Sequence, residues 1–116
     1  MKPKHALKPR LRIMSGDVIA LGPGKVELLR LIVKTGSLRQ AAAGMDMSYM
    51  RAWSLVRLMN ATFRTPLVEA LRGGKTGGGA RLTPAGETVL ALYGQMEKEA
   101  ARAVDGTWKR LRRFLR

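Results

Sequence analysis

The chain has 116 residues, of which 46% are hydrophobic, so it is long enough for one compact domain with its own core. Its 22 lysines and arginines against 8 acidic residues give a formal net charge of +14, which indicates a polyanionic partner, either nucleic acid or an anionic membrane. Cysteine is absent and His5 is the only histidine, which argues against disulfides, zinc sites and histidine-based catalysis. We therefore expect no metal, no cofactor and no enzymatic activity.

Membrane insertion and export are not expected. The apolar runs are far shorter than the roughly 20 residues that cross a bilayer, and Met1–His5 leads into no apolar signal core. The positive charge is concentrated at the two ends, in residues 1–12 and 102–116. We accordingly divide the chain into a basic arm with a hairpin (1–20), a central domain (21–103) and a basic amphipathic tail (104–116).

The first elements in chain order are a small hairpin and a helix. Residues 8–14 alternate imperfectly, Ser15-Gly16-Asp17 is a turn signal, and Val18–Leu21 is a short apolar run. Gly22-Pro23-Gly24 then opens a helix over about residues 24–35, which Gly36 ends. One face of this helix carries Leu28, Leu29, Ile32 and Val33.

Two helices joined by a short turn follow, with the spacing of a helix-turn-helix. Ser37 is predicted to cap the first, and Gly44 to end it in the left-handed conformation, with Met45 folding back onto the core. Ser48 is predicted to cap the second, which covers about residues 48–64. Its core sector contains Ala52, Val56, Met59 and Phe63.

A β-wing and a long helix complete the expected fold. Leu67–Arg72 and Ala80–Leu82 are expected to pair around a glycine-rich loop. Thr83 then caps a helix that Gly106 is expected to interrupt. A helix of about 20 residues is about 30 Å long, more than one small body covers. We therefore expect its apolar stripe to form a dimer interface rather than to pack only on its own core, through Val89, Leu92, Tyr93, Met96 and Ala100.

The predicted fold class is thus mainly α with a small β component, a winged helix-turn-helix with an N-terminal hairpin and a long C-terminal dimerisation helix. The second helix of the helix-turn-helix is the candidate reader of a DNA major groove, through Ser48, Tyr49, Met50, Arg51, Ser54 and Arg57. The other interpretation is an ordinary amphipathic helix with a solvated basic face. Further DNA contacts are expected from the first helices and the wing, namely Ser37, Arg39, Arg72, Lys75, Thr76 and Arg81. Trp53 is expected to pack in the core.

Gly74-Lys75-Thr76 also resembles part of a nucleotide-binding loop, but the longer pattern fails. A P-loop requires glycine five residues before Gly74, where this chain has Glu69, and a strand-to-helix context that this segment lacks. Nucleotide hydrolysis is therefore not expected.

Two segments together resemble a known family. Ser48-Tyr49-Met50-Arg51-Ala52-Trp53 and the glycine-rich run up to Thr83 resemble the DNA-binding domain of ModE-type molybdate-responsive regulators, a winged helix related to LysR-type regulators. The resemblance covers about Leu21–Glu99, and it implies a homodimer with the long helix at the dimer contact. Met50 stands where the family often has lysine, so the base preference does not transfer. Family members continue into an oxyanion-binding domain, and the resemblance gives no support to molybdate sensing by this chain.

We predict a homodimeric, cytoplasmic and nucleoid-associated regulator of transcription that binds a near-palindromic site in double-stranded DNA; no membrane partner is expected and any effector is unknown. One alternative is an architectural DNA-binding protein with little sequence preference. A second is an oxyanion sensor that binds its ligand at the dimer interface, and a third is a membrane-surface protein that uses the basic tail.

Overall fold

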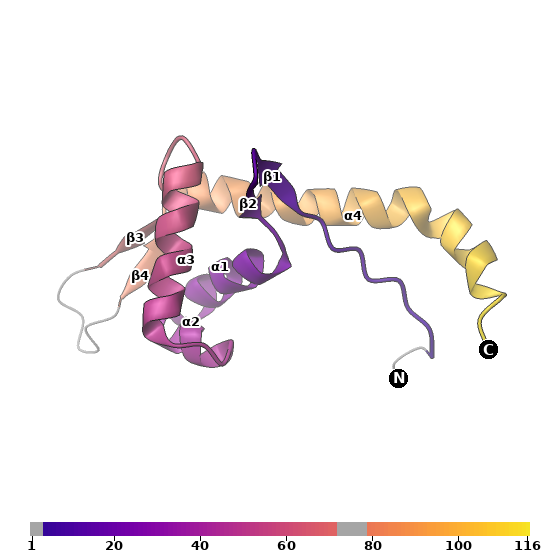
Figure 1. Cartoon of the computed structure of the whole chain (residues 1–116), viewed down its shortest axis with the longest axis horizontal. Coiled ribbons are helices and arrows are strands. Elements are labelled where there is room, and N and C mark those ends of the chain that lie inside the picture. Colours follow the sequence, from indigo (N-terminus) through magenta and orange to yellow (C-terminus); the bar gives the residue numbers. More distant parts are fainter. Residues whose placement is uncertain (1–3, 72–78) are drawn as a thin grey trace.

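The computed structural model describes residues 4–71 and 79–116. Within these residues, four helices and four short strands follow one another as β1 (Ile13–Ser15), β2 (Val18–Leu21), α1 (Pro23–Thr35), α2 (Leu38–Gly44), α3 (Tyr49–Thr62), β3 (Val68–Ala70), β4 (Ala80–Leu82) and α4 (Pro84–Arg112). Figure 1 shows α1, α2 and α3 gathered at one end of the long helix α4. This arrangement confirms the predicted winged helix-turn-helix with an N-terminal hairpin and a long C-terminal helix.

The strands form two separate antiparallel pairs. In the first, β1 pairs with β2, with an irregular register between Ile13 and Met14. In the second, Val68, Glu69 and Ala70 of β3 face Leu82, Arg81 and Ala80 of β4, so both predicted pairings are present. The strands β2 and β4 have the predicted bounds, whereas β1 and β3 are shorter than the sequence pattern indicated.

The core lies where α1, α2 and α3 meet β2, β3, β4 and the first turns of α4. Its buried members are Leu21, Val26, Leu28, Leu29, Ile32, Leu38, Ala41, Ala42, Ala52, Val56, Met59, Leu67, Val68, Ala80, Leu82 and Tyr93. Val33 was expected on the inner face of α1, but it is 61% exposed in the last turn of that helix, although the preceding Ile32 is buried.

The turn between α2 and α3 is built differently from the prediction. Gly44 is the last residue of α2 and is not left-handed; Asp46 takes that conformation, with φ of 53°. The N–H of Met47 donates to Ala42 O (3.1 Å) and that of Asp46 to Ala43 O (3.1 Å), which satisfies the last carbonyls of the helix. A Cβ on Gly44 would lie 3.3 Å from Leu31 Cδ1, so this glycine serves the close packing of α2 on α1.

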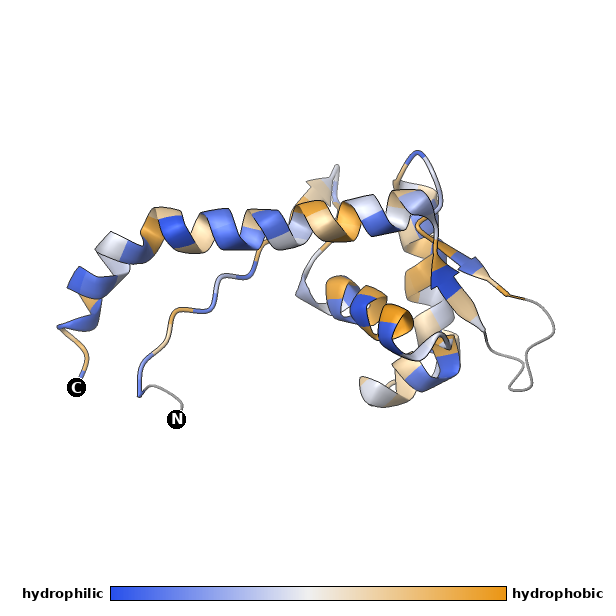
Figure 2. Ribbon diagram, turned by 180° about the vertical axis from the view of Figure 1, so that it is seen from behind, coloured by the Kyte–Doolittle hydropathy of each residue, from blue (hydrophilic) through white to orange (hydrophobic). Residues whose placement is uncertain are grey.

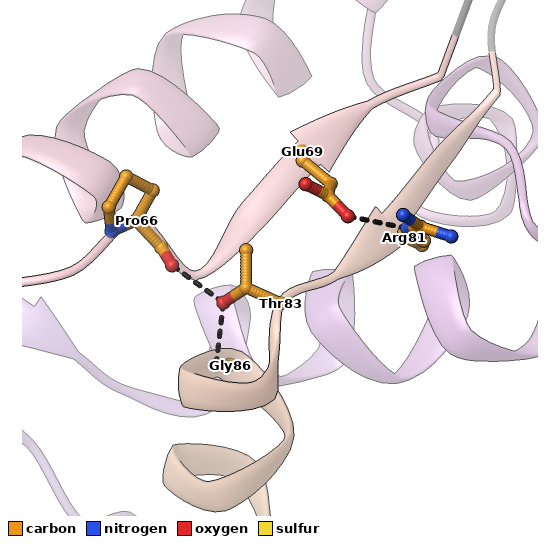
Figure 3. A network of polar contacts seen from close by, with 5 residues as sticks. All are labelled: Pro66, Glu69, Arg81, Thr83 and Gly86. Atoms are coloured by element: carbon orange, nitrogen blue, oxygen red, sulfur yellow. Dashed lines mark hydrogen bonds and ion pairs between the residues drawn. The ribbon is translucent and has the colours of Figure 1, made fainter.

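Helix α4 begins at a threonine whose hydroxyl makes two hydrogen bonds. Thr83 Oγ1 accepts the N–H of Gly86 (3.0 Å) and donates to Pro66 O (2.6 Å), as Figure 3 shows. The helix then continues for 29 residues through Gly106, so the expected interruption is wrong. One exposed glycine costs a helix only about 1 kcal/mol, and the Asp105–Lys109 ion pair (2.9 Å) spans the same turn.

The molecule is elongated, with principal extents of 55 × 33 × 23 Å, because α4 projects beyond the body. Along the projecting half, hydrophilic and hydrophobic residues alternate in Figure 2. The N-terminal arm follows this half: Tyr93 Oη donates to Leu11 O (2.7 Å), and the His5 ring donates to Arg116 O (2.8 Å). Within residues 4–71 and 79–116, no helix is long and apolar enough to cross a membrane.

Candidate nucleic-acid interface

The first turns of α3 expose one side of the helix to solvent. Ser48 Oγ accepts the N–H of Arg51 (3.1 Å) and so caps the helix as predicted. Burial of Ala52, Val56 and Met59 against the core turns the opposite side outward. That side carries Met50, which is 69% exposed, together with the exposed residues Arg51, Ser54 and Arg57. The geometry therefore leaves these side chains accessible, as a reading helix requires.

Two aromatic rings with a cation at each end form a row that runs from α2 along α3. The Arg39 guanidinium lies 4.6 Å from the centre of the Tyr49 ring, and Tyr49 meets Trp53 edge to face at 6.2 Å. Arg57 lies 5.9 Å from the Trp53 ring centre. Tyr49 and Trp53 are half-buried against the core, which agrees with the expectation for Trp53. The spacing of four residues from Tyr49 to Trp53 to Arg57 was the sequence signal for this row, but Arg39 depends on the fold.

Ser37 does not offer its side chain to DNA. The residue is only 4% exposed, and its Oγ accepts the N–H of Gln40 (3.1 Å) at the start of α2. Its backbone N–H donates to Thr35 Oγ1 (3.2 Å). The predicted role of Ser37 as a DNA contact is therefore corrected: its hydroxyl caps α2, while Arg39 in the same helix is exposed.

The base of the wing is tied to the helix-turn-helix. The N–H of Ala80 donates to Gly36 O (3.1 Å), and Gly79 pairs with Ser37 as an isolated bridge. On the outer side Arg81 Nε forms an ion pair with Glu69 Oε1 (2.5 Å), visible in Figure 3. Sequence reasoning assigned Arg81 to DNA without this partner. Arg72, Lys75 and Thr76, also predicted as DNA contacts, lie outside the described residues.

Asn60 joins the end of α3 to the start of the wing. Its Oδ1 accepts the N–H groups of Leu67 (2.8 Å) and Val68 (3.2 Å), and its Nδ2 donates to Val68 O (3.0 Å). One side chain thus satisfies three backbone groups in the connection between α3 and β3. The periodicity of α3 gave no indication of this role.

The predicted dimer residues of α4 fall into two groups. Leu92 (54%) and Met96 (42%) are exposed, and Ala100 is half-exposed. Val89 packs partly against the core, and Tyr93 is 1% exposed within its own protomer. Tyr93 is therefore corrected from an interface residue to a core residue, because it points toward the body and bonds Leu11. Burial and the nearby Glu97 carboxylate raise the pKa of Tyr93.

This architecture agrees with comparison to known proteins. Residues 24–87 match the model of the bacterial regulatory helix-turn-helix proteins of the lysR family, which is more than half of the chain. The chain belongs to the lysR family. Its resemblance to ModE-type regulators is also confirmed, because several relatives carry that name.

Among the relatives of this lysR-family chain are three bacterial proteins. The molybdenum-pterin-binding protein MopB of Rhodobacter capsulatus is 44% identical over 78% of the chain and 34% of the relative. The molybdenum transport protein ModE of Azotobacter vinelandii is 37% identical over 79% of the chain and 34% of the relative. The DNA-binding transcriptional dual regulator ModE of Escherichia coli K12 is 37% identical over 72% and 32%. The chain spans about a third of the length of these relatives.

Two solved structures share the fold. The DNA-binding domain of CbnR, solved with DNA, gives a TM-score of 0.59 at 18% identity and covers 76% of this chain and 95% of that one. Vibrio fischeri DarR, also solved with DNA, gives 0.54 at 22% identity, over 80% of this chain and 30% of that one. These similarities establish the winged-helix fold of the lysR-family domain.

Proposed function

We propose that this lysR-family domain binds double-stranded DNA sequence-selectively and regulates transcription in the bacterial cytoplasm, where that DNA lies. The observation that carries the proposal is the exposed side of α3, which presents Met50, Arg51 and Ser54 from its first turns while the other side is anchored in the core. A helix held in this way can enter a major groove with its N-terminal residues at the base edges. The Escherichia coli relative, named a DNA-binding transcriptional dual regulator, supports the same function.

The side chains of α3 and its neighbours are suited to two kinds of DNA contact, with bases and with phosphates. Arg51 is suited to donate to the acceptor pair of guanine, and Met50 offers an apolar surface that can contact a thymine methyl group. Ser48 and the N–H groups of the first turn of α3 are suited to phosphate, because the positive end of the helix dipole lies there. Arg39 and Arg57 are held over aromatic rings, so they reach phosphate with reduced side-chain freedom.

We further propose that the protein acts as a homodimer through α4. Leu92 and Met96 are exposed one turn apart on α4. Figure 1 shows that this helix projects beyond the body. Pairing this strip with the same strip of a second copy would remove apolar surface from water. Two-fold symmetry then relates the two reading helices and favours a near-palindromic site.

Selection of binding sites from random duplexes tests the function. We expect a motif with two-fold symmetry, bound far more tightly than bulk DNA at fixed salt. Arg51→Ala should lower the specific affinity by about 1–3 kcal/mol and relax the preference at one position of each half-site. The matched control is Lys98→Ala, which removes one positive charge from the exposed surface of α4 outside its basic end. Absence of any enriched motif would contradict sequence-selective binding.

An architectural role is the second candidate, and the distribution of charge favours it. The arm and the end of α4 lie side by side at the far end of the molecule, joined through His5 and Arg116, and both are rich in lysine and arginine. A polycationic surface of this kind binds duplex phosphate without regard to sequence. A ratio of specific to non-specific affinity near one in the same competition would favour this role over the regulator.

A further inference from the structure

A cavity of about 590 Å³ opens between the N-terminal hairpin, the start of α1 and the flank of α3. Its volume falls within the range of roughly 300–1,000 Å³ that is typical of small-molecule sites. It lies on a side of α3 that differs from the exposed side carrying Met50, since Leu55 and Leu58 line it. The proposed DNA contacts do not use this cavity, apart from Arg51.

The walls of the cavity are largely apolar. Val18 and Ile19 of β2 and Leu58 of α3 line it and remain 39%, 39% and 41% exposed. Met45 and Met47 add flexible side chains from the turn between α2 and α3. These exposed aliphatic side chains surround one concavity and favour a ligand with an apolar body. Binding of such a ligand removes its own apolar surface and that of the cavity walls from water.

The charge of the cavity is positive. Arg10, Arg12, Lys25 and Arg51 line it, against one carboxylate, that of Asp17. The Lys25 ammonium donates to the backbone oxygen of Ile19 at the cavity wall, and burial lowers the pKa of this lysine. Helix α1 starts beside it at Gly22 without a side-chain cap, so the positive end of its dipole adds to the field. These groups favour an anion.

We infer that this cavity binds a small organic carboxylate with an aromatic or branched apolar body. A bare inorganic oxyanion would match the cations but leave Val18, Ile19 and Leu58 in water. A neutral hydrocarbon would match the walls but leave the cations without a partner. Only a ligand with both an apolar body and a carboxylate contacts the apolar walls and pairs with the cations of the cavity.

Arg51 connects this cavity to the reading helix. It lines the cavity and lies in the first turn of α3, among the side chains proposed to contact bases. A carboxylate paired with Arg51 competes with DNA for the same guanidinium. This step rests on the proposed function: the ligand should weaken DNA binding, and DNA should weaken ligand binding by the same factor.

Calorimetry on the full chain without DNA tests the site, with 2-naphthoate as the probe. We expect saturable binding of one molecule per chain, much weaker binding of 2-naphthalenemethanol and none of inorganic phosphate. Lys25→Met retains an apolar stem but loses the charge. It should lower the affinity for 2-naphthoate by about tenfold, as expected for the loss of a charged hydrogen bond. Lys98→Met on the exposed surface of α4 removes the same charge and should leave the affinity unchanged.

A second pair of variants tests the apolar wall. Leu58→Gln should weaken 2-naphthoate severalfold, whereas Leu111→Gln, at a similarly exposed position on α4, should have no effect. Circular dichroism melting establishes that each variant is folded before its affinity is compared. No binding of 2-naphthoate to the wild type, or equal losses from Lys25→Met and Lys98→Met, would overturn the site.

A titration with DNA separates the site from its coupling. Saturating 2-naphthoate should lower the affinity for a selected duplex severalfold, and Lys25→Met should reduce that effect. Normal 2-naphthoate binding with unchanged DNA affinity would overturn the competition for Arg51 and leave the site standing. If the protein selects no duplex at all, the proposed function fails, while the calorimetry still decides whether the cavity binds the carboxylate.

Discussion

The carbonyl oxygen of Leu67 lies only 2.1 Å from the position that a Cβ on Gly86 would occupy. The same oxygen accepts the N–H of Thr83 (2.9 Å), so the start of β3 is held directly against the first turn of α4. At position 86, only glycine leaves room for the Leu67 carbonyl, because any other residue would place its Cβ against this oxygen. The glycine therefore sets how closely the long helix approaches the wing.

Substitution of Gly86 should be destabilising in spite of the gain in helix propensity. We expect Gly86→Ala to lower the free energy of unfolding by about 1–3 kcal/mol, because the backbone of Leu67 must move. Gly94→Ala is the matched control in the same helix. No atom of another part of the described chain lies within 4 Å of its Cβ position, and the substitution should raise the free energy of unfolding by up to about 1 kcal/mol. Urea unfolding measures both. Equal effects of the two variants would show that α4 and β3 are not in close contact.

Asn60 should be as important for the wing as the strands themselves. Asn60→Ala leaves two N–H groups and one carbonyl at Leu67 and Val68 without their side-chain partner, and we expect a loss of about 1–3 kcal/mol. Hydrogen exchange of the Leu67 and Val68 amides should accelerate more than that of α1 amides. Gln95→Ala, which removes an exposed amide on α4, is the control and should change neither quantity. Uniform acceleration throughout the domain would contradict a local role.

Tyr93 should make stability depend on alkaline pH. Its folded-state pKa is raised, chiefly by burial and further by Glu97, so the folded protein keeps the phenol protonated where the unfolded chain ionises. This contribution is complete below the unfolded pKa of about 10 and is lost as pH rises through the folded pKa. Tyr93→Phe should remove that dependence above pH 10 and, by deleting the bond to Leu11, cost about 1 kcal/mol at neutral pH.

Guanidinium unfolding between pH 8 and 11 measures how the free energy of unfolding of Tyr93→Phe changes with pH. Tyr49→Phe is the control, because it removes the other phenol of the chain and should leave the Tyr93-dependent slope in place. Identical slopes for wild type and Tyr93→Phe would contradict the assignment.

Local signals were sufficient for most of the fold. The caps at Ser37, Ser48 and Thr83 and the paired strands follow from short-range rules, and all three caps form the expected hydrogen bonds. Two local predictions were wrong, namely the left-handed conformation of Gly44 and the interruption of α4 at Gly106. The burial that the sequence did not show depends on contacts between distant segments. Ser37 is buried where the wing meets the α1–α2 junction: Gly79 pairs with Ser37, and the N–H of Ala80 donates to Gly36 O. Tyr93 is buried where the N-terminal arm returns to it. Periodicity identifies an apolar stripe on α4 but not which part faces the body.

That division of the α4 stripe leads to a specific prediction about assembly. Leu92→Glu with Met96→Glu places two charges on the exposed strip, outside the buried core, and should convert a dimer into a monomer while leaving the domain folded. Val33→Glu, at a residue 61% exposed on α1, is the control for an apolar-to-charged change elsewhere. Sedimentation velocity measures the state of each. Affinity for a two-fold symmetric duplex should fall in the double variant, because each half-site is then bound alone. A double variant that remains dimeric would place the interface outside Leu92 and Met96.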